Sequence, residues 1–208
     1  MRQWILSLAA LALVASPVLA GKYNKAVSVG DKAPGIAGVP AVSADGTKDM
    51  QLNLADIKED VVVVAFLANH CPAVQACEDR LFDTVKAYKG KSVKFVGVCC
   101  TDPSSSMGAD DGIEAIKAKI KDGKYNMAYG VDGSGKIGKA FGATVTPQFF
   151  VLDKDRAIRY TGLLDNGGRD ESKISKTYVK SAIDALLAGD SIEETETRAM
   201  GCGIPYAK

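Results

Sequence analysis

The chain has 208 residues, of which 47% are hydrophobic and 25% are charged, with a formal net charge of +1. This composition fits one globular domain with a full core, and the balanced charge argues against a nucleic-acid partner. The first 20 residues contain one positive charge, a short apolar stretch and a small-residue end. They are typical of a secretory signal peptide cut after Ala20, and too short to span a membrane. We therefore expect an exported protein, periplasmic or extracellular, with no membrane attachment after cleavage.

Beyond a polar N-terminal arm, strand and helix patterns alternate. Continuous apolar runs predict buried strands, and apolar residues at helical spacing predict helices. The predicted strands are 36–42, 61–70, 92–100, 128–132, 148–152 and 157–161, and the helices are 71–88, 110–121, 136–141 and 178–188, with a helical turn at 53–57. The fold class is therefore α/β, with a central mixed sheet, an antiparallel C-terminal hairpin and flanking helices. This divides the chain into a signal peptide (1–20), a domain (21–190) and an irregular tail (191–208).

The most informative point in the chain is Cys71-Pro72, directly after the apolar run that starts at Val61. Proline is tolerated in the first turn of a helix because its missing N–H would have no partner there. Cys71 is therefore expected at a helix N-terminus, where unpaired backbone N–H groups and the helix dipole favour an anion. For a cysteine, that anion is the thiolate, which is the reactive form.

This layout resembles the thioredoxin superfamily, and more closely its secreted AhpC/TSA branch. The matching segments are 29–34, 69–72, 146–153, 160–166 and 201–204, which together span the chain from Val29 to its end. The resemblance implies that Cys71 is the nucleophile and that Pro147 is cis and lies beside it. It also implies that the backbone of Thr146 is exposed, so that it can pair with a bound substrate chain.

Two departures from the family patterns put the reaction in doubt. Val74 stands where thioredoxins have the second cysteine of Cys-x-x-Cys, so no disulfide can form within that motif. Ala68 stands where typical peroxiredoxins have the threonine of Thr-x-x-Cys. The sequence therefore leaves both disulfide exchange and peroxide reduction open.

The partner of Cys71 is also open, because the total of five cysteines is odd. Cys77 is the first candidate; on an intact helix the two residues are about 9 Å apart along the axis, so bonding requires unwinding. Q-type peroxiredoxins use a similar spacing, although a buried helix residue explains Cys77 equally well. Cys202 is the next candidate, because a flexible tail can bring it to Cys71, or to Cys99 or Cys100, at modest entropic cost. Adjacent strand residues face opposite ways, so at most one of Cys99 and Cys100 faces Cys71; at least one is expected to be an ordinary buried residue.

Two charged neighbours are weaker candidates. His70, the only histidine, could stabilise the Cys71 thiolate by its charge, or it could face solvent. Arg80 could orient the thiolate or a peroxide, although a solvated helix face is the commoner case.

These patterns predict a thiol-dependent oxidoreductase without a cofactor. Cys71 would attack a disulfide sulfur or a peroxide oxygen, and Cys77 or Cys202 would release it as an intramolecular disulfide. The expected partners are a protein thiol, disulfide or peroxide substrate and an external thiol reductant. The alternatives are copper handling, which the cysteine spacing and the single histidine disfavour, and a binding module that has lost turnover. No metal site is expected.

Overall fold

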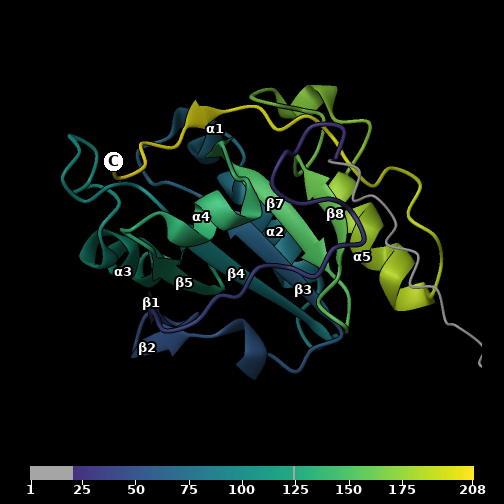
Figure 1. Ribbon diagram of the computed structural model, residues 1–208, viewed down its shortest axis with the longest axis horizontal. Helices are drawn as coiled ribbons and strands as arrows, with labels where there is room; N and C mark the ends of the chain where they lie inside the picture. The colour runs from purple at the N-terminus through teal and green to yellow at the C-terminus, as the bar shows by residue number, and fades with distance from the viewer. Residues whose placement is uncertain (1–20, 124) are drawn as a thin grey trace, which may run out of the picture.

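The computed structural model describes residues 21–123 and 125–208; the predicted signal peptide lies outside them. Seven strands form one mixed sheet in the order β2-β1-β5-β4-β3-β7-β8 (Figure 1). They are β1 (Val39–Val42), β2 (Asp49–Leu52), β3 (Val61–Phe66), β4 (Val93–Cys99), β5 (Ala128–Val131), β7 (Gln148–Leu152) and β8 (Ile158–Gly162). Strands β3, β4 and β5 are parallel, and β7 and β8 form the predicted antiparallel hairpin. The predicted fold class is confirmed.

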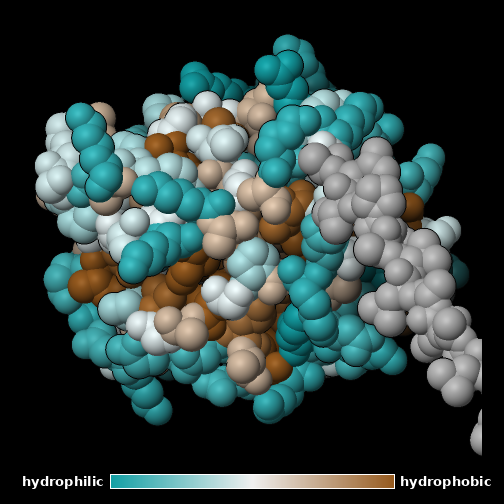
Figure 2. All heavy atoms as spheres, viewed as in Figure 1, coloured by the Kyte–Doolittle hydropathy of each residue, from teal (hydrophilic) through white to brown (hydrophobic). Residues whose placement is uncertain are grey.

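Helices and loops cover both faces of this sheet. On one face pack α2 (Glu78–Ala87), α3 (Ile113–Lys121) and α5 (Tyr178–Ala188). The other face carries α4 (Lys136–Phe141) and parts of the N-terminal segment up to the 3-10 turn Leu54–Asp56. Figure 2 shows hydrophobic residues across the middle of this second face. This face is covered by the short helix α4 and by chain in loops and turns.

Strand β3 explains why a continuous apolar run was the strongest strand signal. All six of its residues are buried. Val61, Val63 and Ala65 belong to the core under α2, α3 and α5, whereas Val62, Val64 and Phe66 belong to the core under α4. Because side chains alternate along a strand, a strand covered on both faces needs apolar residues at every position.

The predicted helix 71–88 is wrong as a single element. The structure has a one-turn helix α1 (Pro72–Gln75), a break at Ala76 and Cys77, and then α2. The periodic apolar residues Leu81 and Val85 are buried as expected, so the pattern located the buried face but not the break.

Three strands were not predicted. In β2 only Leu52 is buried, so its sequence lacks the alternation that identifies a strand. The other two, β6 (Val145–Thr146) and β9 (Cys202–Gly203), are two residues long and pair only with each other. Their pairing joins residues far apart in the sequence, which no local pattern can indicate.

The C-terminal tail, expected to be flexible and irregular, is held to the domain along its length. The backbone N–H of Thr197 donates to the carbonyl oxygen of Thr161 near the end of β8, the N–H of Thr161 donates to the carbonyl oxygen of Thr195, and Thr197 is buried. The Tyr206 hydroxyl donates to the carbonyl oxygen of Ala143 at 2.6 Å. Between these two anchors the tail passes beside α1, as the yellow trace in Figure 1 shows. Among the described residues, no helix has both the length and the apolar character that crossing a membrane requires.

Candidate active site: a disulfide between Cys71 and the tail

Cys71 lies directly before α1, with Pro72 at the first helical position as predicted. Its exposed fraction is 0%. Since α1 has only four residues, the helix dipole at Cys71 is smaller than a helix over 71–88 would have supplied. The local backbone N–H groups at the helix start remain.

Cys71 forms a disulfide with Cys202, across a sequence separation of 131 residues. The Cα atoms are 6.0 Å apart, within the usual range for a disulfide. Cys202 reaches this position as part of β9, which pairs antiparallel with β6, so that Cys202 lies opposite Thr146 and Gly203 lies opposite Val145. A backbone ladder, and not only the sulfur bond, therefore places the tail.

The segment before β7 completes this arrangement. The Thr146-Pro147 bond is cis, as predicted. The carbonyl oxygen of Thr146 lies 3.2 Å from the Cys71 sulfur, and Thr146 is buried. The backbone of Thr146 thus contacts Cys71 and pairs with the strand that contains Cys202.

Cys77 is a free thiol, although it was the first candidate to bond Cys71. It lies at the break before α2, and its sulfur is 3.4 Å from the carbonyl oxygen of Val74. Burial raises the pKa of Cys77 to about 12, so it is protonated at neutral pH. The break that the sequence required for a Cys71–Cys77 bond is present, but the structure bonds Cys71 to the tail instead.

Cys99 and Cys100 are buried free thiols on opposite faces of the sheet. Cys99 belongs to the same core as Cys71, and Cys100 belongs to the core under α4. Burial raises the pKa of Cys99 to about 12, and raises that of Cys100 further, with the carboxylate of Asp132 adding to the effect. Both therefore have the surroundings of ordinary core residues.

His70 does not face solvent. Its ring nitrogen Nδ1 lies 2.6 Å from a carboxylate oxygen of Asp111, and its backbone N–H donates to the other oxygen. The exposed fractions of the two side chains are 13% and 1%. The hydroxyl of Thr101 also donates to Asp111. These bonds attach the residue before Cys71 to the loop that precedes α3.

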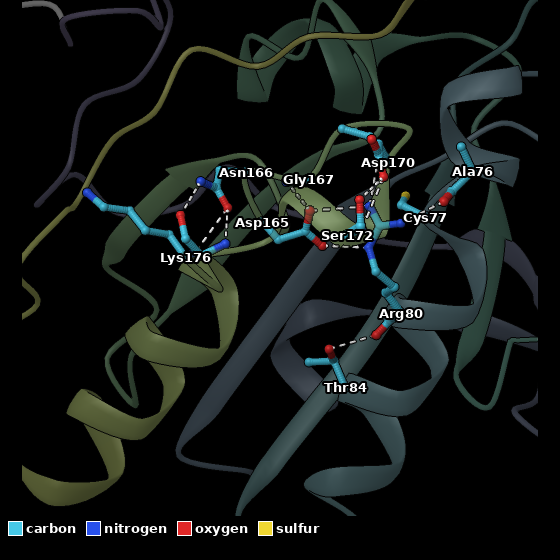
Figure 3. A network of polar contacts seen from close by, with 12 residues as sticks. Ala76, Cys77, Arg80, Thr84, Asp165, Asn166, Gly167, Asp170, Ser172 and Lys176 are labelled. Atoms are coloured by element: carbon cyan, nitrogen blue, oxygen red, sulfur yellow. Dashed lines mark hydrogen bonds and ion pairs between the residues drawn. The ribbon is translucent and has the colours of Figure 1, made fainter.

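Arg80 is not on a solvated face, contrary to the commoner case weighed from the sequence. Its Nε and Nη2 donate to the two carboxylate oxygens of Asp165 at 2.8 and 3.2 Å. It also donates to the carbonyl oxygen of Ala76 (Figure 3) and to that of Gly168. With exposed fractions of 11% and 5%, the two charges form a mostly buried pair. Arg80 thus ties the break between α1 and α2 to the loop after β8.

A cavity of about 290 Å³ opens beside the disulfide. Cys77, Pro147 and Cys202 are among the residues that line it, with Leu163 and Leu164 as apolar wall. Cys71 is not a lining residue. The half-buried Cys202 is therefore the residue of the disulfide that a molecule in this cavity would meet.

Sequence reasoning missed the residues that fix the site from a distance. Asp111 and Asp165 hold His70 and Arg80, and Gly201 lets β9 approach Thr146. Asp165 and Gly201 lie in segments that resemble the family, but nothing in a single sequence assigns them a partner. Over residues 21–123 and 125–208, no group of three or more His, Cys, Asp or Glu side chains could hold a metal ion.

Comparison with known proteins agrees with this geometry. The sequence pattern of the AhpC/TSA family matches residues 29–161 of this chain. A hypothetical protein from Sinorhizobium meliloti 1021 superposes with a TM-score of 0.77 and 27% identity, covering 88% of this chain and 97% of its own. An uncharacterized conserved protein from Geobacillus kaustophilus superposes with a TM-score of 0.76 and 29% identity, covering 86% of this chain and 92% of that one.

More distant structures share the fold. The mitochondrial 2-Cys peroxiredoxin from Plasmodium falciparum has a TM-score of 0.56 at 18% identity, covering 76% of this chain and 94% of that one. No curated protein matches the chain. The sheet order, the helix after Cys71 and these likenesses together identify the fold as thioredoxin-like.

Proposed function

Because the chain belongs to the AhpC/TSA family of thiol-dependent redox proteins, we propose that it is a thiol–disulfide oxidoreductase. Cys71 is the nucleophile and Cys202 is the resolving cysteine. One observation carries the proposal: Cys71 is bonded to a cysteine on a strand that pairs with β6, beside cis Pro147. The site holds an extended, cysteine-bearing segment with its sulfur on Cys71, which is the arrangement that disulfide exchange requires.

The structure corresponds to the oxidised form of this cycle. In the reduced form, the Cys71 thiolate attacks one sulfur of a substrate disulfide, and the other substrate sulfur leaves as a thiolate. The Cys202 thiolate then attacks the Cys71 sulfur, and the second substrate sulfur leaves. The substrate has gained two electrons, and the chain holds the Cys71–Cys202 disulfide. An external dithiol reduces that bond, and the burial of Cys71 against the half-buried, cavity-lining Cys202 supports Cys202 as the point of its attack.

Burial and bonding support Cys202 over Cys77 as the resolving residue. Cys77 faces the same cavity but is a buried thiol whose pKa is raised to about 12. A protonated thiol is a poor nucleophile. Cys77 remains an alternative only if the α1–α2 region opens during turnover.

Peroxide is the second candidate substrate, because the same disulfide would result. Peroxide would convert the Cys71 thiolate to a sulfenic acid, and Cys202 would condense with it and release water. Ala68, in the position of the peroxiredoxin threonine, argues against this route. Export, proposed from residues 1–20, would place either reaction where disulfides persist.

The test starts from the fully reduced protein and gives it either a model protein disulfide or a brief pulse of peroxide. Disulfide mapping by mass spectrometry should find Cys71–Cys202, with the larger rate for the protein disulfide. Cys71→Ser should abolish the reaction. Cys202→Ser should trap the substrate on Cys71, and Cys77→Ser should react as the wild type does.

Three results would count against the proposal. If Cys71 stays a free, unmodified thiol with both oxidants, the chain is a binding module and not an enzyme. If Cys71–Cys77 forms first, the resolving residue is misassigned. If only peroxide oxidises Cys71, the second candidate replaces the first.

A further inference from the structure

The residue before Cys202 approaches the site more closely than any side chain would permit. A Cβ atom on Gly201 would overlap the carbonyl oxygen of Thr146 and would lie 2.7 Å from its carbonyl carbon and 3.3 Å from Cδ of Pro147. The atoms it would meet are backbone and a proline ring, which cannot turn away as a flexible side chain does. The backbone φ of Gly201 is not in the left-handed region. Glycine is therefore needed here for space and not for its conformational freedom.

The same tail segment contains a second glycine without this constraint. Gly203 ends β9 two residues further on, so the two glycines flank Cys202. A Cβ on Gly203 would have no atom within 4 Å. The close approach is thus confined to the residue that directly precedes the cysteine.

The carbonyl of Thr146 is close both to Cys71 and to Gly201. Its oxygen lies 3.2 Å from the Cys71 sulfur and is the atom that a Cβ at residue 201 would overlap. A bulkier residue before the cysteine would push the strand away from β6 and carry the cysteine sulfur away from Cys71. The size of the residue before the cysteine therefore affects whether the disulfide with Cys71 can form.

We propose that the edge of β6 selects the sulfur that bonds to Cys71, by accepting an extended segment in which glycine directly precedes the cysteine. In the oxidised chain this segment is the tail itself. After reduction releases the tail, the same edge accepts a Gly-Cys segment of a substrate polypeptide. This inference rests on the proposed function and adds the substrate class to it.

The first experiment tests the selection within the chain. Reduced wild type, Gly201→Ala and Gly203→Ala are exposed to excess oxidised glutathione, and the Cys71–Cys202 bond is followed by mass spectrometry. Overpacking against fixed backbone should slow bond formation in Gly201→Ala by about tenfold or more, and Gly203→Ala should match the wild type. Equal rates for Gly201→Ala and Gly203→Ala would overturn the inference.

The second experiment tests the selection between molecules, in a chain whose Gly201 is intact. Reduced Cys202→Ser receives the tail heptapeptide Arg-Ala-Met-Gly-Cys-Gly-Ile, activated as a mixed disulfide with thionitrobenzoate. The Cys71 thiolate attacks the peptide sulfur, the peptide–thionitrobenzoate bond breaks, and the released thionitrobenzoate anion is measured by its absorbance.

The comparison peptide has alanine in place of the glycine before its cysteine. It should react with Cys71 about tenfold or more slowly, while both peptides should react equally with a small free thiol. Equal rates on Cys71 would overturn the inference. The proposed function fails separately, if the wild type forms no Cys71–Cys202 bond at all.

Discussion

Strands β3 and β4 are parallel neighbours with their carboxyl ends at the same edge of the sheet, and cysteine follows or ends each of them. Only the cysteine after β3 is bonded. Cys99 ends β4 inside the core, where burial keeps its thiol protonated. Cys71 lies beyond the end of β3, where cis Pro147 and the tail strand meet it.

The comparison teaches that a position at the active edge of an α/β sheet does not make a cysteine reactive. Both residues are fully or almost fully buried in the described structure. Both belong to the same core, but Cys71 is also bonded to the two-residue strand β9, whose release on reduction we propose, whereas Cys99 lies within the core as a free thiol. The predictions below break or sharpen this contrast, from the largest expected effect to the smallest.

Removal of the tail bond should give the largest change in stability. Cys202→Ser opens a loop of 131 residues, whose closure contributes up to about 5 kcal/mol to the free energy of unfolding in the chain-entropy account. Denaturant unfolding of the oxidised proteins should show this loss. With reductant present, the wild type and the variant should unfold together; coincident curves without reductant would contradict the disulfide.

Alkylation should separate the two classes of cysteine. After reduction at pH 8, iodoacetamide should modify Cys71 and Cys202 and spare Cys77 and Cys99. A pKa raised from the usual 9 to about 12 lowers the thiolate fraction roughly a thousandfold. Mass spectrometry of the digested protein gives the sites, and the denatured chain should react at all five. Equal labelling of Cys77 and Cys202 in the native protein would show that the two classes of cysteine do not differ in reactivity.

The Arg80–Asp165 pair should contribute more to the free energy of unfolding than an exposed pair, because it is mostly buried and joins the helix break after Cys71 to the loop after β8. Arg80→Met leaves a buried carboxylate without its cation and should lower the free energy of unfolding by about 3 kcal/mol. Lys180 and Asp184 form a comparable bond of 2.7 Å in an exposed setting. Lys180→Met should therefore cost less than about 1 kcal/mol. Equal losses in thermal or denaturant unfolding would show that burial of the Arg80 pair is unimportant.

The smallest effect concerns alkaline pH. Below about pH 9 the Cys77 thiol is protonated in both the folded and the unfolded chain, so it gives no pH dependence. Above pH 9 the unfolded chain loses this proton while the folded chain keeps it up to about pH 12, so the free energy of unfolding falls as pH rises. In Cys77→Ala this decline should be less steep, by about 1 kcal/mol per pH unit. Parallel declines between pH 9 and 10.5 would contradict the raised pKa.

Much of the fold was readable because its signals are local. The run from Val61 to Phe66 is apolar at every position because both faces of β3 are covered, and the spacing of Leu81 and Val85 marks the buried side of α2. The helices over 136–141 and 178–188 begin and end where the sequence indicated. Strand β2 was missed because only one of its residues is buried.

The site was readable only in part. Pro72 after an apolar run placed Cys71 at a helix start, and the resemblance of the Thr146-Pro147 segment indicated the cis bond. The helix was expected to continue through residue 77, because helical periodicity does not indicate a break at which the Ala76 carbonyl accepts a hydrogen bond from the Arg80 side chain. Cys202 was ranked after Cys77 because proximity in sequence was the only available measure of proximity in space.

The sequence alone determined the fold class and the identity of the cysteine at the strand end, since both depend on residue types within one element. Only the tertiary structure decided which sulfur bonds to Cys71. That choice depends on β9 pairing with β6, on Gly201 fitting against the Thr146 carbonyl, and on burial of the other three thiols. These are contacts between segments far apart in the chain, and their geometry exists only once the chain has folded.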